Sequence, residues 1–244
     1  MTPRLPPGVR CKRPGAAIID VGGESTRPGS APVSSEQEQA RVLPVIRALA
    51  AGGACVSVDT RHAATMQAAL AAGARVVNDV SGLSFDPDAA GVVARSGCAV
   101  VLMHMRGTPE TMDGFARYDD VVAEVAEELG DRLAAATAAG ICCERITLDP
   151  GIGFAKTGAH NLALLRGLSA LRRLGRPLLV GVSRKRFIGH LTSVGAPQGR
   201  LAGSLAAGLF AVSRGASMLR VHDVSDTVSA LRVWQALSPA GGAD

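Results

Sequence analysis

Short apolar segments recur along the chain from residue 16 onward, separated by longer stretches of mixed polarity. Each segment is rich in Val, Ile or Leu, ends in a polar residue and is followed by a loop that contains Gly, Ser or Pro. The apolar residues are contiguous rather than alternating, which is typical of strands buried on both faces. We predict seven strands, at residues 16–21, 55–59, 75–80, 99–104, 145–149, 177–183 and 217–222.

Ala- and Leu-rich stretches of helical length follow these strands. The helices are predicted at residues 34–51, 62–72, 86–96, 119–139, 159–174, 200–214 and 225–237. Strands that alternate with helices through short loops predict βαβ units, a parallel sheet and an α/β fold class. An open doubly wound sheet also fits this alternation. The number of units favours a TIM-type (β/α) barrel, of which seven strand–helix units are visible instead of the usual eight.

Residues 1–15 break this pattern, because they contain four prolines and no periodicity of either kind. They also carry four basic residues and no acidic one. We expect residues 1–15 to be a basic, proline-rich and disordered leader. No Pro/Ser-rich linker interrupts the later units, so residues 16–244 are expected to form one barrel domain.

The formal net charge of the 244-residue chain is +5, of which the leader supplies +4. Because this charge is concentrated in the leader and no aromatic side chains lie between the basic ones, we expect no nucleic-acid partner. No apolar run approaches membrane-spanning length, and the N-terminus has no apolar signal-peptide core. The five cysteines are irregularly spaced, which indicates reduced thiols and a cytoplasmic location.

Polar side chains stand at the end of every predicted strand. In a barrel of parallel strands these ends meet on one face, where a small-ligand site is expected. The residues are Asp20, Glu24, Asp59, Asn78, Asp79, His104, Asp149, Ser183, Lys185, Arg220 and His222. Lys185 is one of three lysines in a chain with 23 arginines, and Asn78 is one of two asparagines. A lysine in such a chain indicates the need for a compact positive charge.

Seven segments, in order, resemble the strand-end motifs of dihydropteroate synthases. They are DVGGESTRPGS (20–30), SVDT (57–60), VVNDVSG (76–82), LMHMRGTP (102–109), LDPGIGFAK (148–156), GVSRKRFIG (181–189) and RVHDV (220–224). The resemblance implies a transferase of folate biosynthesis that condenses 6-hydroxymethyl-7,8-dihydropterin pyrophosphate with p-aminobenzoate to give 7,8-dihydropteroate and pyrophosphate. It also implies a pterin-binding barrel, a homodimer formed through the last helices, and a target of sulfonamides.

The resemblance assigns the pterin and its pyrophosphate to several strand ends. Asp149 is implied to accept the adjacent amide and amino groups of the pterin ring, because a carboxylate fits that edge with two hydrogen bonds. Taken alone, Asp149 is explained equally well as a helix cap. The other implied ligands are Thr26, Asp59, Asn78, Met103, Lys185, Arg220 and His222, and the implied catalytic residues are Asp59, Lys185, Arg220 and His222. His104, beside Met103, is open to a ligand role or a structural one.

The same resemblance assigns p-aminobenzoate to a second group of residues. They are Thr26, Arg27, Pro28, Phe154, Ser183 and Lys185. Hydroxyl and N–H donors suit the carboxylate of that substrate, and an aromatic ring suits its benzene ring. An ordinary Pro-Gly turn would explain the sequence at residues 27–29 as well.

Members of this family begin with another strand and helix before the motif at residues 20–30. The loop after that strand carries an Asn that binds Mg²⁺ and pyrophosphate, whereas residues 1–15 contain no Asn, Asp or Phe. The resemblance thus implies Mg²⁺ as the cofactor, while no metal ligand is identifiable in this chain. We expect a truncated or mis-started chain that lacks the first of the eight units. The alternative function is a non-catalytic pterin-binding remnant.

Two other barrel functions fit less well. A methyltetrahydrofolate-type methyltransferase shares the pterin-binding barrel but should lack the STRPG and SRK segments at residues 25–29 and 183–185. A generic phosphate-binding barrel enzyme would explain Arg220 and His222 but not Asp149 together with Asn78. The expected partners are therefore two small-molecule substrates and a second copy of the chain, without nucleic acid or membrane.

Overall fold

The computed structural model describes residues 15–26 and 30–238. The chain divides into two compact units, each built from two stretches of sequence. Unit 1 comprises Met1–Met103 and Asp131–Ile146, and unit 2 comprises His104–Gly130 and Thr147–Asp244. Apart from Gly15, the leader expected at residues 1–15 lies outside the described residues. The single domain expected at residues 16–244 stays a prediction.

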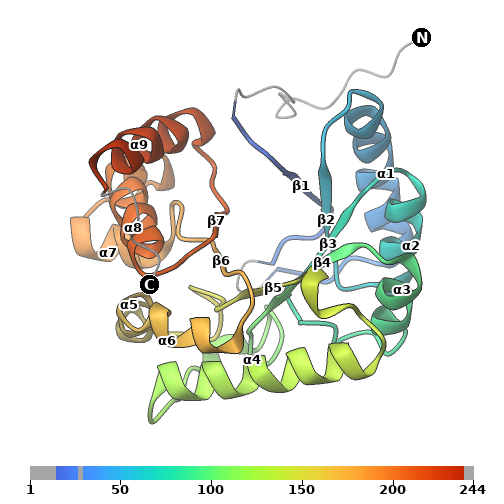
Figure 1. Cartoon of the computed structure of the whole chain (residues 1–244), viewed down its shortest axis with the longest axis horizontal. Helices are drawn as coiled ribbons and strands as arrows, with labels where there is room; N and C mark the ends of the chain where they lie inside the picture. The colour runs from blue at the N-terminus through green and yellow to red at the C-terminus, as the bar shows by residue number, and fades with distance from the viewer. Residues whose placement is uncertain (1–14, 27–29, 239–244) are drawn as a thin grey trace. The chain divides into compact units, whose positions relative to one another are not determined.

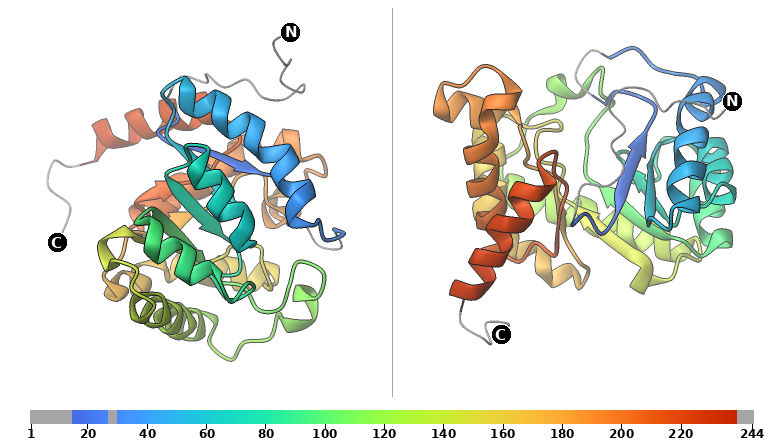
Figure 2. Two further views of the ribbon diagram at one scale, coloured as in Figure 1. Left: turned by 90° about the vertical axis from the view of Figure 1, so that its right-hand side faces the viewer. Right: turned by 90° about the horizontal axis from the view of Figure 1, so that it is seen from above.

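Parallel strands form the sheet of unit 1, and they are neighbours in the order of the chain (Figure 1). The strands are β1 (Ile19–Gly22), β2 (Val56–Asp59), β3 (Val76–Asp79) and β4 (Ala99–Met103). The connecting helices are α1 (Ser35–Ala51), α2 (Ala63–Ala71) and α3 (Ala89–Ser96). Figures 1 and 2 show these helices side by side along the sheet. The polar motifs lie at the carboxyl ends of these strands, where each strand leads into its helix.

The core of unit 1 lies between this sheet and its helices. Val56, Val58 and Val77 of the strands are fully buried, and so are Ile46 of α1 and Met66 of α2. Burial of one such side chain stabilises a fold by about 1.5–3 kcal/mol. The contiguous apolar segments of the sequence therefore form interior strands, as predicted.

Unit 2 contains most of the second half of the chain. Its strands are β5 (Ile146–Asp149), which begins at the last residue of unit 1, β6 (Leu179–Val180) and β7 (Met218–Leu219). Its helices are α5 (Gly158–Arg166), α6 (Leu168–Leu171), α7 (Arg186–Thr192), α8 (Leu201–Ser213) and α9 (Val224–Leu237), together with the first part of α4 (Val121–Ala138). Strands β6 and β7 pair in parallel, and Leu148 of β5 forms a parallel bridge with Leu178.

The positions of all seven predicted strands are confirmed, but β6 and β7 are much shorter than expected. Each keeps two residues in the ladder. Helix α7 was not predicted, since the segment GVSRKRFIG was interpreted as a strand-end motif. This helix has no side-chain cap at its first turn and is held instead by the buried Phe187 and Ile188.

The single helix predicted at residues 159–174 is divided at Gly167 into α5, α6 and a 3₁₀ turn at Arg172–Leu174. A Cβ atom at Gly167 would lie 2.7 Å from Cγ2 of Val122 in α4. Close packing against α4 therefore requires glycine here, and glycine is a poor residue for a helix interior. The start of α5 follows local rules, since Thr157 and His160 form a reciprocal capping box.

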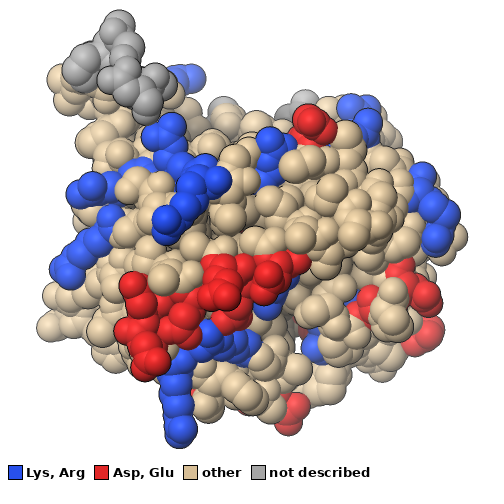
Figure 3. All heavy atoms as spheres, turned by 60° about the horizontal axis from the view of Figure 1, so that its bottom comes forward, with Lys and Arg blue, Asp and Glu red and all other residues tan. Residues whose placement is uncertain are grey.

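A band of acidic side chains crosses the face shown in Figure 3. The sequence of helix α4 includes four acidic residues, Glu124, Glu127, Glu128 and Asp131. Basic side chains lie on both sides of the band, so this face has mixed charge (Figure 3). Of the helices within residues 15–26 and 30–238, none is long and apolar enough to cross a membrane.

Candidate functional site

Asp59 and Asn78 lie next to each other at the ends of β2 and β3. They are register partners across the parallel pair, and Gly22 of β1 is the partner of Asp59 on its other side. The side-chain amide of the buried Asn78 donates from Nδ2 to Oδ2 of Asp20 at 3.1 Å. This bond orients the amide and directs its oxygen away from Asp20. Unit 1 therefore presents a partly exposed carboxylate beside a fixed amide.

Asp79, the other polar residue at the end of β3, closes its own loop. Its Oδ1 accepts the N–H and the hydroxyl of Ser81, each at 2.7 Å, and its Oδ2 accepts the N–H of Leu83 at 3.0 Å. Burial raises the pKa of the Asp79 carboxyl, and the bonds from Ser81 oppose that rise. These contacts account for an aspartate at position 79 by its role in the loop structure, without a role in ligand binding.

The loop after β1 is anchored by a buried ion pair. Arg61 donates to both carboxylate oxygens of Glu24, at 3.0 and 2.9 Å, and Glu24 also accepts the N–H of Val33 at 3.1 Å. Thr26 is partly exposed on this loop. Arg27 and Pro28, two of the predicted p-aminobenzoate ligands, lie outside the described residues.

In unit 2, Asp149 ends β5 and is buried, with 7% of its surface exposed. Its Oδ1 accepts the N–H of Gly151 at 2.7 Å. Burial raises the pKa of the Asp149 carboxyl. The N–H of Gly151 opposes this rise, and so do the positive charges of Lys185, Arg220 and Lys156. Asp149 is therefore a buried carboxylate in a field of three cations.

Lys185 lies against the loop that follows Asp149. Its Nζ is 4.3 Å from the centroid of the Phe154 ring, within the range in which a cation is attracted to a ring face. Gly153, at a φ of 84°, allows this approach, because a Cβ there would lie 3.1 Å from Cδ of Lys185. The loop after β5 thus brings Phe154 and Lys185 together.

Ser183 and His222 are in contact beyond the ends of β6 and β7. Oγ of Ser183 accepts the backbone N–H of His222 at 3.2 Å and lies 3.0 Å from Nδ1 of its ring. Arg184 forms a two-bond ion pair with Asp223, which ties the two loops together. Burial lowers the pKa of His222, and the charge of Arg184 lowers it further, while Asp223 opposes this. The imidazole is therefore expected to be neutral near pH 7.

Arg220 is anchored beside these residues. Its backbone N–H donates to the carbonyl of Val180 in β6 at 3.1 Å, and the residue is exposed. The predicted ligands of unit 2, from Asp149 to His222, are therefore all carried by the loops after β5, β6 and β7. The described ones of unit 1 lie on the loop after β1 and at the ends of β2, β3 and β4.

Met103 and His104 are both buried, with 2% and 0% of their surfaces exposed. The carbonyl of Met103 accepts a bond from Arg132. The ring of His104 is held by Glu128 on one side and Lys156 on the other. For His104 the structure favours the structural role, while the pterin contact expected of Met103 stays a prediction.

Sequence reasoning missed the residues that hold these loops in place. They are Arg61, Glu128, Lys156, Arg184 and Asp223. Arg61 and Arg184 lie beside residues that were singled out, but their partners are distant in the sequence and no local pattern identifies them. Lys156 had a weak signal, because it is one of the three lysines of the chain.

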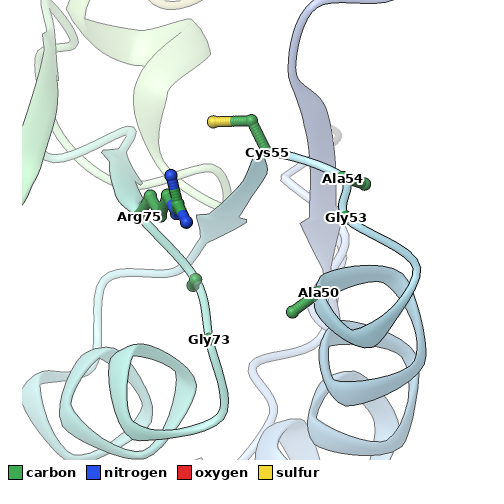
Figure 4. Close-up of a pocket in the computed structure, with 7 residues that line it drawn as sticks. Ala50, Gly53, Ala54, Cys55, Gly73 and Arg75 are labelled. Carbon is green, nitrogen blue, oxygen red and sulfur yellow. The ribbon is translucent and has the colours of Figure 1, made fainter.

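The part of the chain that the structure describes contains no group of three or more His, Cys, Asp or Glu side chains that could hold a metal ion. A cavity of about 470 Å³ lies in unit 1 instead at the beginning of β2 and β3 (Figure 4). Cys55 and Arg75 line it, with small residues from the turns after α1 and α2. It is at the opposite end of these strands from Asp59 and Asn78, so it is not part of the candidate site.

Comparison with known proteins places the chain in a family. Residues 9–222 match the family described as pterin binding enzyme. The dihydropteroate synthase of Escherichia coli K12 is 48% identical over 223 residues, which cover 91% of this chain and 78% of that protein.

Solved structures agree with this relationship. The dihydropteroate synthase of Xanthomonas albilineans with 4-aminobenzoic acid is 50% identical, with a TM-score of 0.87, over 92% of this chain and 81% of that one. The same enzyme in complex with 7,8-dihydropteroate is 48% identical, with a TM-score of 0.84 and the same coverage. The predicted fold class, a TIM-type α/β fold with parallel strands, is thereby confirmed. The chain belongs to the pterin binding enzymes and, among them, to the dihydropteroate synthase family.

Proposed function

We propose that the chain condenses 6-hydroxymethyl-7,8-dihydropterin pyrophosphate with p-aminobenzoate to give 7,8-dihydropteroate and pyrophosphate. The observation that carries the proposal is Asp149, a buried carboxylate that cations surround and that belongs to a matched family motif. A pterin offers an amide and an amino group side by side, and one carboxylate accepts both. Relatives whose structures hold 4-aminobenzoic acid and 7,8-dihydropteroate support the choice of substrate and product.

In the proposed reaction the C–O bond between the pterin methylene and pyrophosphate breaks, and its electron pair leaves with the pyrophosphate. The amine nitrogen of p-aminobenzoate then forms a C–N bond with the methylene carbon and releases a proton. Lys185 and Arg220 stabilise the charge that develops on the leaving group. A neutral His222 donates a hydrogen bond to a phosphate oxygen while Ser183 fixes its orientation.

The second substrate is proposed to bind close to Lys185. Ser183 offers a hydroxyl and Phe154 an apolar ring face, and Lys185 lies against that ring. Sulfonamides, which also join an aniline ring to an acidic group, are proposed to compete for this position. In unit 1 the proposed roles of Asp59 and Asn78, as ligands of polar pterin atoms, are supported by their adjacent positions and by the fixed amide.

Mg²⁺ is proposed as the cofactor because of the family resemblance. It would supply positive charge to the pyrophosphate when bound. The described residues do not offer a cluster of metal ligands, so they do not fit the ion by themselves. None of the residue roles given above depends on the ion.

A homodimer is proposed from the surface of unit 2. An apolar groove of about 320 Å³ is lined by residues of α5, α7 and α8. Leu191 and Phe210 line it and are 64% and 38% exposed. Exposed apolar surface of this kind marks protein interfaces, and a second copy of the chain is the proposed occupant. The irregular cysteine spacing supports a cytoplasmic location.

The test is calorimetric titration of the purified chain with the pterin pyrophosphate and Mg²⁺, followed by a dihydropteroate assay after p-aminobenzoate is added. Binding followed by product formation is expected, and Asp149→Asn in the same buffer serves as the control that should lose binding. A pterin affinity that is the same in the wild type and in Asp149→Asn contradicts the proposal. Binding without any product would support the alternative of a non-catalytic pterin-binding protein.

A further inference from the structure

The loop from Pro150 to Lys156 rests on a buried side chain that has no role in the reaction as proposed. His104 is fully buried, and its backbone N–H donates to the carbonyl of Asp149 at 2.9 Å. Gly151, at a φ of 65°, lies so close to His104 that a Cβ there would be 1.9 Å from the His104 carbonyl oxygen. The backbone of this loop is thus packed directly onto His104.

Lys156 ends the same loop and returns its side chain to His104. The ammonium of Lys156 lies 2.9 Å from Nδ1 of His104 and donates to the carbonyl of Phe154 at 2.9 Å. Only 9% of Lys156 is exposed. A buried charge is stable only when it is hydrogen-bonded to fixed partners, so this position is specific for the ammonium group.

These contacts determine the tautomer of His104. An ammonium group has no lone pair, so Nδ1 of the ring must be the acceptor of the bond from Lys156. The proton of the neutral ring is then on Nε2, which lies 3.0 Å from Oε2 of Glu128 and donates to it. The other oxygen of Glu128 accepts from Arg106 at 2.8 Å. A continuous series of hydrogen bonds therefore leads from Arg106 to Phe154.

Aromatic contacts close the loop on its outer side. The hydroxyl of Tyr118 donates to the carbonyl of Ala155 at 3.1 Å, and Arg106 lies over the Tyr118 ring with Cζ at 4.0 Å from the centroid. Ala155 itself has a φ of 48°, a conformation that is unfavourable for alanine and persists only where the surroundings enforce it. Arg106 is thus linked to the loop in two ways, through Glu128 and His104 on the buried side and through Tyr118 on the outer side.

We propose that Lys156 and His104 are positioning residues for the pterin: the bond from Lys156 to Nδ1 of His104 holds the loop that sets the direction of the Asp149 carboxylate and of the Phe154 ring, and Glu128 only selects the tautomer of the native His104 ring. The inference rests on the proposed function for its substrate. It assigns Lys156 a second effect, since its charge is one of three that favour the ionised form of Asp149 and oppose the rise in its pKa. Neither residue touches the reacting atoms in this account.

Three variants test this proposal. Lys156→Met keeps the length and apolar stem of the side chain and removes its charge. At His104, Asn keeps an acceptor at the position of Nδ1 and loses the donor to Glu128, whereas Gln keeps a donor at the position of Nε2 and loses the acceptor for Lys156. Asn also removes more volume from the buried site, so its effect on stability should be the larger one.

The dissociation constant of the pterin pyrophosphate is measured by calorimetry with Mg²⁺ present, and exchange of the Gly151 amide proton is followed by NMR without substrate. Lys156→Met and His104→Gln should each weaken pterin binding and speed the exchange by about tenfold or more, the size expected for a lost bond to a charged group. His104→Asn should change both by less than about threefold, although it lowers the melting temperature more.

If pterin affinity follows the melting temperature instead, with His104→Asn the weakest binder, His104 is merely part of the core and the proposal is wrong. Unchanged affinity and exchange in Lys156→Met overturn it as well. A wild-type protein that binds no pterin defeats the proposed function, but the exchange rates of Gly151 still decide whether the loop depends on Lys156 and His104.

Discussion

Gly151 allows the close contact between the loop after β5 and the backbone of His104, and its replacement by alanine can be worked out from the structure. A residue with a Cβ at a φ of 65° is disfavoured by about 1 kcal/mol. In addition the new Cβ would lie 1.9 Å from the carbonyl oxygen of His104. Two backbone segments would have to separate by more than about 1 Å, and overpacking of this kind costs about 1–3 kcal/mol.

Gly151→Ala is therefore expected to lower the free energy of unfolding by about 2–4 kcal/mol. Gly175→Ala is the matched control, because Gly175 has a φ of 67° in the same unit and a Cβ there would have nothing within 4 Å. That control should lose about 1 kcal/mol, which is the conformational term alone. For a chain of this length the two losses correspond to falls in melting temperature of about 4–16 °C and about 2–4 °C.

The assay is urea unfolding followed by circular dichroism, with thermal melts of both variants and the wild type. If the slopes of the urea transitions are equal, the difference between the midpoints of Gly175→Ala and the wild type gives the cost of a Cβ at positive φ. The further difference between Gly151→Ala and Gly175→Ala gives the cost of the close contact with His104. Equal losses of stability in Gly151→Ala and Gly175→Ala would refute the reasoning, since the close approach would then contribute nothing. Gly151→Ala should also weaken pterin binding, because the N–H of Gly151 orients the Asp149 carboxylate.

Three further outcomes are expected. Burial raises the pKa of Asp149 above its ordinary value of 3.8, so ionisation of this carboxyl destabilises the fold at pH 7. Asp149→Asn should therefore bind no pterin but unfold at an equal or higher urea concentration than the wild type at pH 7, and this advantage should disappear as the pH falls towards 3.8. A variant that is less stable than the wild type at pH 7 would contradict this. Ser183→Ala removes the hydroxyl that accepts the backbone N–H of His222 and donates to Nδ1 of its neutral ring, and kcat/KM for p-aminobenzoate, from initial rates, should fall about fivefold, the effect of one hydrogen bond. An unchanged value would exclude that role. Leu191→Glu puts a charge into the apolar groove of unit 2 and should shift the chain from dimer to monomer in light scattering after gel filtration; a wild type that is already monomeric would remove the basis of the dimer proposal.

The sequence by itself was sufficient for the strands, most of the helices, the fold class and the family. Contiguous Val and Ile residues must be buried on both faces, and a polar residue after each such segment must lie at a strand end, so the pattern locates Asp59, Asn78 and Asp149 without coordinates. Local signals also identify helix starts, as the pair Thr157 and His160 shows.

Only the tertiary structure decided how these residues are held. The ion pairs Glu24–Arg61 and Arg184–Asp223 join residues 37 and 39 positions apart, and His104 meets Lys156 across 52 positions. Such contacts depend on which loops the packed strands bring together, and no local propensity encodes them. Helix α7 and the break at Gly167 belong to the same class, since burial of Phe187 and Ile188 and the close approach of Val122 determine them.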